Sequence, residues 1–194
     1  GSMSAAGIAE VAPGRFCPGI GAGSQPIVES WNGDVFARPA TRVREMAQFL
    51  RQVLSGERVV FQGETFAVNG FRLTRPPARP IPIYVAALRP GMLRVAGEVG
   101  DGVILNWLSA SDVPRSVQVV REAAARAGRD PAAVEITARL LINVDPPGPA
   151  SNLAVRRHVT AYLNVPVYQA FQAWLGRGEA VEPMWSAWRR GDRR

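Results

Sequence analysis

A turn of four residues, Leu88-Arg89-Pro90-Gly91, lies between an apolar run and a helical pattern, and its composition suits the binding of an anion. The N–H groups of a helix's first turn have no acceptor inside the helix and point outward at its start. Pro90 suits this first turn because its missing N–H is no loss there, and Gly91 lets an oxygen atom approach the backbone closely. With a further N–H from Met92 and the charge of Arg89, the turn predicts a phosphate site. The alternative interpretation is that Pro-Gly does no more than begin a helix.

Other reactive side chains are few. The sequence holds one cysteine, Cys17, and one histidine, His158, so we expect neither an intrachain disulfide nor a zinc site built from Cys and His. Cys17 lies in an apolar stretch, where a thiol is expected to be buried. His158 lies on an expected outer helix, where we expect a surface or packing residue rather than a base. The sequence assigns no catalytic acid or base and no metal site.

The hydrophobic pattern places the turn between a strand over 83–87 and a helix over 90–99, with another strand over 102–106. The other expected elements are a strand over 15–20, a helix over 42–54, a hairpin within 59–73, a helix from 110 or 111 to 127, a strand over 134–144 and helices over 151–163 and 167–175. Strands that alternate with helices are typical of parallel βαβ units. The nearly continuous apolar strands agree, because buried parallel strands do not alternate. We therefore expect an α/β fold with about four parallel strands covered by helices.

Composition places the chain among ordinary globular proteins, since its 194 residues are 47% hydrophobic and 20% charged. We expect one domain over 5–183, preceded by a tag remnant at 1–4. No apolar run approaches the roughly 20 residues of a membrane-spanning helix, so no membrane partner is expected. With one cysteine and no visible secretory signal, the sequence predicts a cytoplasmic protein.

The charge is strongly basic, with 23 Lys and Arg residues against 16 Asp and Glu and a formal charge of +7. Such an excess is found in nucleic-acid-binding proteins. Here the arginines are scattered along expected helices, and no aromatic platform for stacking bases accompanies them. Their one dense cluster lies at the end, where 184–194 is expected to be a basic, flexible tail. We expect no nucleic-acid partner.

Four stretches carry a resemblance to a known family: RPIPIYVAALRPGMLRVAGEVGDGVILNW at 79–107, GRFCPGIGAGS at 14–24, ESWNG at 29–33 and the run at 42–66. Together they resemble the luciferase-like monooxygenase superfamily, in its branch of deazaflavin (coenzyme F420) dependent oxidoreductases. The resemblance covers most of 5–145. Each stretch alone is weak, but the combination is specific.

The resemblance implies a TIM-barrel-type (β/α) repeat and an oxidoreductase in which hydride passes between the deazaflavin and a small organic substrate. The cofactor would do the hydride chemistry, and the protein would orient it. The residues that would bind the cofactor are Ala22, Gly23, Ser24, Ala87, Leu88, Arg89, Gly91 and Met92. The substrate pocket would hold Asn106, with Trp107 beside it at the same strand end.

The sequence departs from the family in length and at one site position. A complete (β/α)₈ barrel takes about 250 residues, so this chain is expected to form a partial barrel that lacks the first strands and the last. Ser24 stands where the sugar-phosphate dehydrogenases of this branch have a glutamate. Two alternatives therefore stay open: a non-catalytic remnant that serves assembly or binds a phosphate-bearing ligand, and an enzyme that uses flavin mononucleotide (FMN).

Assembly is the last expectation from sequence. Four parallel strands cannot close a barrel, and the two outermost ones would expose unpaired backbone groups. Because such edges tend to find partners, we expect a homodimer.

Overall fold

The computed structural model describes residues 1–192, and the chain divides into two compact units where one domain was expected. The first, called the sheet unit, holds Gly1–Asn106 and Val113–Ala138. The second, called the helical unit, holds Trp107–Asp112 and the chain from Arg139 onward. Each unit is described by itself.

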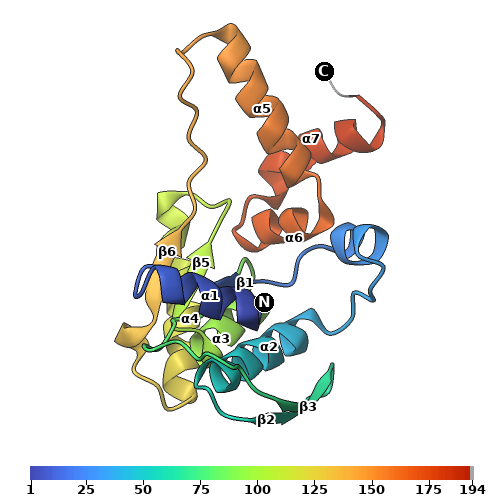
Figure 1. The fold of residues 1–194 in the computed structure, drawn as a ribbon. Coiled ribbons are helices and arrows are strands. Elements are labelled where there is room, and N and C mark those ends of the chain that lie inside the picture. The colour runs from blue at the N-terminus through green and yellow to red at the C-terminus, as the bar shows by residue number, and fades with distance from the viewer. Residues whose placement is uncertain (193–194) are drawn as a thin grey trace. The chain divides into compact units, whose positions relative to one another are not determined.

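A four-stranded parallel sheet forms the centre of the sheet unit, in the order β1-β4-β5-β6 (Figure 1). Its strands are β1 (Gly19–Ile20), β4 (Tyr84–Ala86), β5 (Gly102–Leu105) and β6 (Glu135–Ala138). The structure therefore confirms the expected α/β class and the four parallel strands. It also confirms that β1 and β6 are the outermost strands of this sheet.

Two strands are shorter than the sequence predicts. The expected strand over 15–20 is a strand only at Gly19–Ile20, and the one over 134–144 ends at Ala138. The last register pair joins Ala138 to Leu105, the final residue of β5, so a longer β6 would have no neighbour to bond with. The strand β6 therefore ends where its hydrogen-bonded pairing with β5 ends, even though the segment that follows includes residues with a high β-propensity.

Two helices cover one face of the sheet and follow strands as expected. They are α3 (Pro90–Val99) and α4 (Val113–Arg126), the latter preceded by the short helix η2 (Ala110–Asp112). Gly97 lets α3 and α4 approach closely, because a Cβ at this position would lie 2.2 Å from the carbonyl oxygen of Val120. Val85 and Val103 are fully buried on the covered face.

A second apolar cluster lies in the same unit, around α2 (Pro39–Leu54) and the antiparallel hairpin of β2 (Val59–Gln62) and β3 (Ala67–Phe71). Phe49 packs edge-on against Phe61, with ring centroids 5.9 Å apart. The helix α1 (Ser2–Val11), which the sequence pattern misses, contributes buried Ala5 and Ala6 to this cluster. The first turn of α1 includes residues expected to belong to a tag remnant.

The helical unit consists mainly of three helices: α5 (Pro149–Leu163), α6 (Pro166–Trp174) and α7 (Gly178–Arg189). The expected tail at 184–194 is wrong for its first part, because residues up to 189 belong to α7. Trp185 is 7% exposed, and its Nε1 donates to the carbonyl oxygen of Leu163 at 2.9 Å. Residues 193–194 of this expectation lie outside the described residues.

Between β6 and α5 the chain runs without regular structure (Figure 1) and exposes the large apolar side chains Leu140, Ile142 and Val144. Within residues 1–192, no helix has both the length and the apolar character needed to cross a bilayer. The short helices η1 (Pro26–Trp31), of the π type, and η3 (Pro131–Ala133) complete the elements.

Candidate functional site at the carboxyl edge of the sheet

The parallel order brings the carboxyl ends of β1, β4 and β5 to one edge of the sheet, where ligands bind in βα proteins. The loop after β1 and the turn after β4 therefore start side by side. A Cβ on Gly21 would lie 3.2 Å from the Cβ of Ala86, which shows how closely these two strand ends approach. The structure thus places the predicted cofactor residues of the two loops at neighbouring strand ends.

The turn after β4 holds the predicted phosphate site. Arg89 is the extended N-cap residue of α3, with φ −111° and ψ 165°, and its side chain is exposed. Its carbonyl oxygen accepts the first helical hydrogen bond, from the N–H of Leu93 at 2.9 Å. Pro90 begins the helix and Gly91 follows, exposed, with no heavy atom within 4 Å of the place where a Cβ would stand. The space beside Gly91 is therefore open.

The other predicted residues of this turn are less exposed. Ala87 is buried, and its N–H donates to the carbonyl oxygen of Ile104 at 3.1 Å. Leu88 and Met92 are half-buried. The predicted set thus divides into a buried strand end and an exposed helix start.

The loop after β1 turns sharply at Gly23, whose φ of +68° lies in the left-handed region that favours glycine. Ala22 and Ser24, on either side, are half-buried. The carbonyl oxygen of Ser24 accepts from the N–H of Val28 at 2.9 Å, so this loop leads directly into η1. The distinctive feature of this loop is therefore the left-handed backbone at Gly23 and not a reactive side chain.

The sheet face opposite α3 and α4 is largely open. The register aligns Gly19, Tyr84, Gly102 and Glu135 across the four strands. Residues two positions further along face the same way, because side chains alternate along a strand; they are Gly21, Ala86, Ile104 and Thr137. Four of these eight residues are exposed: Gly19, Gly21, Ala86 and Glu135. Since faces of parallel sheets are normally covered, this face is unusual.

Tyr84 crosses Gly102 on this open face, since a Cβ on Gly102 would lie 2.8 Å from the tyrosine ring. Its hydroxyl donates a short hydrogen bond to the Glu135 carboxylate. That bond, followed by burial and nearby charges, raises the pKa of the Tyr84 hydroxyl. Cys17, expected to be buried, is exposed and lies near this hydroxyl. Cys17 precedes β1, at a point where the chain has not yet entered the sheet, and its thiol is therefore accessible to solvent.

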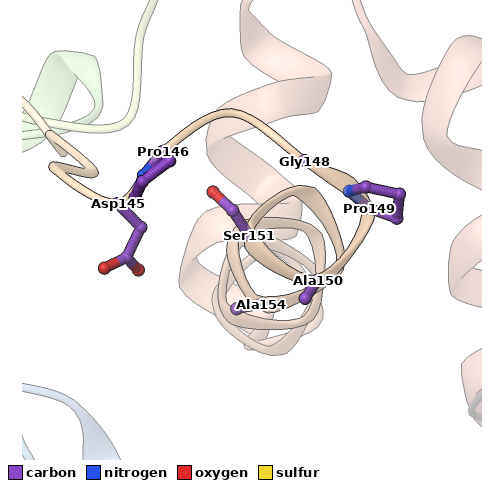
Figure 2. Close-up of a pocket in the computed structure, with 7 residues that line it drawn as sticks. All are labelled: Asp145, Pro146, Gly148, Pro149, Ala150, Ser151 and Ala154. Carbon is purple, nitrogen blue, oxygen red and sulfur yellow. The ribbon is translucent and has the colours of Figure 1, made fainter.

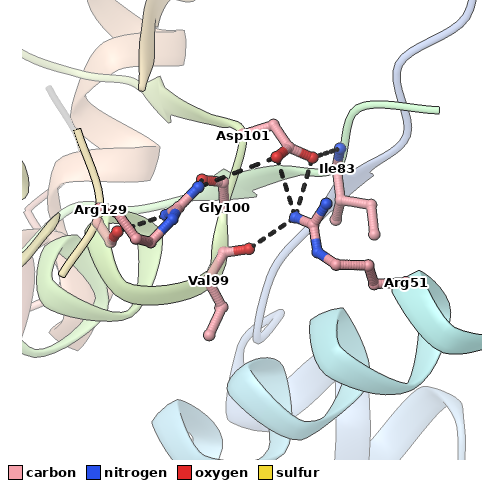
Figure 3. A network of polar contacts seen from close by, with 7 residues as sticks. Arg51, Ile83, Val99, Gly100, Asp101 and Arg129 are labelled. Carbon is pink, nitrogen blue, oxygen red and sulfur yellow. Dashed lines mark hydrogen bonds and ion pairs between the residues drawn. The ribbon is translucent and has the colours of Figure 1, made fainter. Parts of the chain in front are cut away.

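The amino edge of the same sheet carries a dense polar network (Figure 3). The Asp101 carboxylate accepts from Arg51 Nη2 at 3.0 Å and from the backbone N–H of Ile83 at 2.8 Å. Arg129 lies 3.9 Å from this carboxylate and donates to the carbonyl oxygens of Gly97 and Gly100 at 2.5 and 2.7 Å. A shallow hollow is lined by Arg51, Asp101, Arg129 and neighbouring side chains. Because these charges are already paired, we assign the hollow a structural role.

A second hollow lies in the helical unit, where the chain enters α5 (Figure 2). Its lining includes Asp145, Gly148 and Ser151, with prolines and alanines between them. The hydroxyl oxygen of Ser151 accepts from the Asn143 side-chain amide at 2.7 Å. Sequence did not predict this hollow, and its small, mostly apolar lining assembles no catalytic groups. Among residues 1–192 no three His, Cys, Asp or Glu side chains are grouped to hold a metal ion.

Of the predicted substrate residues, Asn106 belongs to the sheet unit and Trp107 to the helical unit. Trp107 has a left-handed backbone, with φ +56°, which is rare for a bulky residue. Its ring stacks on Tyr162 with centroids 4.7 Å apart and lies 6.0 Å from the ring of His158. His158 is exposed, and its ring contacts those of Trp107 and Tyr162. The sequence does not predict the contact of Trp107 with Tyr162, because the two residues are 55 positions apart.

Comparison with known proteins connects this chain to a family. The family model described as luciferase-like monooxygenase matches residues 2–194. A 5,10-methylenetetrahydromethanopterin reductase of Archaeoglobus fulgidus is 36% identical over 138 residues, which are 71% of this chain and 41% of the relative. An F420-dependent glucose-6-phosphate dehydrogenase of Gordonia bronchialis is 32% identical over 140 residues, 69% of this chain and 41% of the relative. The chain thus spans about two fifths of the length of these curated relatives.

Solved structures agree on the fold. The coenzyme F420 dependent tetrahydromethanopterin reductase from Methanopyrus kandleri superimposes with a TM-score of 0.76 at 22% identity, covering 99% of this chain and 60% of that one. The monooxygenase RslO1 from Streptomyces bottropensis gives 0.64 at 21% identity, covering 88% and 56%. These likenesses confirm a fold of the TIM-barrel type. The match of the family model and the identity to a methylenetetrahydromethanopterin reductase and an F420-dependent dehydrogenase confirm the resemblance, and the chain belongs to the luciferase-like monooxygenase family.

Proposed function

We propose that the chain belongs to an oxidoreductase that transfers a hydride between coenzyme F420 and a small organic substrate. Support comes from the relatives of similar sequence, which include F420-dependent dehydrogenases. The observation that carries the proposal is the start of α3, where exposed Arg89 stands beside Gly91 and open space. A phosphate-bearing cofactor tail fits this edge because helix N–H groups and a guanidinium both favour a negative charge.

The roles divide between the two loops of the carboxyl edge. Leu88, Arg89, Gly91 and Met92, with Ala87 at the strand end, would hold the cofactor tail and its phosphate. Ala22, Gly23 and Ser24 would line the ring and its side chain, and Asn106 and Trp107 would face the substrate. When bound, the deazaflavin supplies the ring carbon that accepts or donates the hydride. The chain's own residues bind and orient the cofactor.

Ser24 is assigned to hydrogen bonding. A hydroxyl with an ordinary pKa is a poor proton donor near neutral pH, and efficient general acids have a pKa near the working pH. The described residues place no carboxylic acid at the matching position, so we name no catalytic acid.

The carrying observation is tested by titrating the chain with coenzyme F420. Gly91→Val fills the open space and crowds the first-turn N–H groups, so binding should weaken by roughly 1–3 kcal/mol, about fivefold to 150-fold. Gly178→Val is the matched control, since Gly178 begins α7 and a Cβ there makes only an ordinary contact, 3.7 Å from Ala173. Equal affinity of Gly91→Val and the parent would exclude the helix start as the phosphate site.

FMN is the second cofactor candidate, because the luciferase-like scaffold includes monooxygenases. The same titration with FMN decides between the two rings. Tighter binding of FMN than of coenzyme F420 would replace the deazaflavin in this proposal. Failure of both to bind would favour the non-catalytic alternative, which serves assembly or holds another phosphate-bearing ligand.

We also propose that two copies associate. The outer strands β1 and β6, the open sheet face and the exposed apolar residues after β6 support this association. Light scattering at micromolar concentration should give twice the mass of one chain. A monodisperse species with the mass of a single chain would contradict the dimer.

A further inference from the structure

The loop that follows β5, residues Trp107–Asp112, packs with the helices of the helical unit. Loops at the carboxyl ends of parallel strands contact the ligand in folds of this type. What fixes the shape of this loop therefore bears on ligand binding. The contacts that fix it come from α6 and the residues just after it, 60 or more positions along the chain.

The first contact is at the beginning of the loop. Gln172, on α6, is 6% exposed, and its Nε2 donates to the carbonyl oxygen of Trp107 at 3.0 Å. The hydrogen bond acts on the residue whose backbone is left-handed. Bulky residues keep such a backbone only when their surroundings enforce it. A buried glutamine amide is a costly group to place there unless it is bonded, so the contact is specific.

The second contact is at the end of the loop. Arg177, between α6 and α7, donates through Nη2 to the Asp112 carboxylate at 2.7 Å and to the Ser109 hydroxyl at 2.8 Å. Asp112 also accepts from the N–H of Ser109 at 2.8 Å and from its hydroxyl at 2.6 Å. Burial raises the pKa of Asp112, but the bonds from Ser109 and Arg177 outweigh it, and the pKa lies below its usual range. The carboxylate is therefore held in its charged form.

A third contact joins the other two. Nη1 of Arg177 lies 3.5 Å from Oε1 of Gln172, so the two positioning side chains touch each other. The ring of Trp107 is enclosed at the same time, stacked on Tyr162 and edge-on to Tyr168 at 6.1 Å. The loop is thus held at both ends and through its one large ring.

We propose that Gln172 and Arg177 are positioning residues, which fix the loop after β5 to the helices so that loop and helices move as one body. The loop then presents Trp107 in a set orientation, and the affinity of a ligand that contacts this residue depends on that orientation. The effect on ligand affinity, which is the functional half of this proposal, rests on the proposed function. The first half, the mechanical link, does not.

Hydrogen exchange tests the link without any ligand. Gln172→Leu and Arg177→Met remove the polar contacts and keep side-chain volume. Amides of Ser109 and Asp112, which bond within the loop, should exchange about tenfold faster or more in both variants, since bonds to charged groups contribute most. Arg177→Lys keeps a charge opposite Asp112 and should restore part of the protection.

Matched controls come from α4. Gln118 and Arg126 are exposed and contact only Glu122 of their own helix in the bonds described, at 2.9 and 3.8 Å. Gln118→Leu and Arg126→Met should leave the loop amides unchanged. If Gln172→Leu does not fold, Ser109→Ala is the milder variant, since it removes one hydroxyl, which bonds Asp112, Arg177 and Ser111. Unchanged exchange of the Asp112 amide in Arg177→Met and Ser109→Ala would overturn the proposal.

Titration with coenzyme F420 tests the functional half. Affinity should fall threefold to tenfold in Gln172→Leu and Arg177→Met, which is the effect expected from the loss of one hydrogen bond. It should stay at the parent value in the α4 controls. Faster loop exchange with unchanged affinity would overturn the functional half and leave the link. A parent chain that binds neither coenzyme F420 nor FMN would refute the proposed function, and the exchange result would still decide the link.

Discussion

The two edges of the parallel sheet differ in how their polar groups are satisfied. At the amino edge, Asp101 binds Arg51 and the N–H of Ile83, and Arg129 caps carbonyl oxygens of the α3 end (Figure 3). At the carboxyl edge, Arg89 and Gly91 face open space. One edge completes its bonding within the chain, whereas the other is the edge at which we propose that a phosphate binds.

The difference indicates that stability and ligand binding depend on opposite edges of the sheet in this fold. In (β/α) proteins the amino face carries stability and the carboxyl face carries ligands. Here the separation is visible in individual groups, because the charges of the amino edge are paired to within hydrogen-bonding distance. Variants at the two edges should therefore affect different measurements, one unfolding and the other binding.

The largest expected effect is at the amino edge. Asp101→Ala removes the acceptor of the Ile83 N–H and leaves Arg51 and Arg129 without their carboxylate. We expect the free energy of unfolding to fall by roughly 2–3 kcal/mol, because partly buried groups lose their partners. Chemical denaturation measures it, and affinity for coenzyme F420 should be unchanged.

Glu122→Ala is the control for this prediction. Glu122 forms an exposed ion pair with Arg126 at 3.8 Å, and such pairs contribute about 0–1 kcal/mol. If Asp101→Ala cost no more than Glu122→Ala, the amino edge would not be the stabilising one.

The next effect is at the carboxyl edge. Arg89→Met removes a positive charge beside the start of α3 while keeping most of the side-chain length. Affinity for coenzyme F420 should fall by about 1–2 kcal/mol, the range of a bond to a charged group discounted for exposure. The loss should shrink as salt is added, and the unfolding midpoint should stay that of the parent. An unfolding change without a binding change would reverse the roles of the two edges.

The sequence predicts the parts of this contrast that are local. The apolar runs of β4 and β5 and the Pro90-Gly91 start of α3 are visible in short windows, and the structure confirms these elements. The amino-edge network is not visible, because Arg51 and Asp101 are 50 positions apart and nothing in either neighbourhood marks the pair. Long-range pairing of this kind depends on the fold itself.

Helix ends show a second limit. Pro183 lies inside α7, although a proline in the interior of a helix usually breaks or kinks it, so the local sequence does not show that this helix continues to Arg189. The burial of Trp185 explains why the helix continues. In the candidate site, the β/α pattern predicts the turn that begins α3, and the family resemblance implies the other residues. The hydrogen bond from Gln172 to Trp107 could not be predicted, because it spans 65 positions.

A smaller effect on stability is expected from a second contact at the amino edge, where Tyr84 and Glu135 are the first residues of β4 and β6. Tyr84→Phe removes the bond to Glu135 and should lower the free energy of unfolding at pH 7 by about 0.5–1 kcal/mol. The pKa of Tyr84 is raised in the folded state, so its stabilisation is complete below the unfolded value, about 10, and is lost as pH rises above it. The gap between parent and variant should therefore narrow above pH 10. A gap that widened there would mean that the bond does not hold the neutral phenol.

The smallest effect belongs to Ser24, in the loop whose shape depends on the left-handed Gly23. Ser24→Ala keeps that backbone and removes one half-buried hydroxyl, so affinity for coenzyme F420 should fall by about 0.5–1 kcal/mol, the net value of a neutral hydrogen bond. The unfolding midpoint should not move, because the hydroxyl is at the ligand edge and not in the core. Titration and thermal unfolding of the same preparation measure both. A stability loss as large as that of Asp101→Ala would show that this loop, too, is held by the chain's own bonds, and the contrast between the two edges would then apply to the helix start alone.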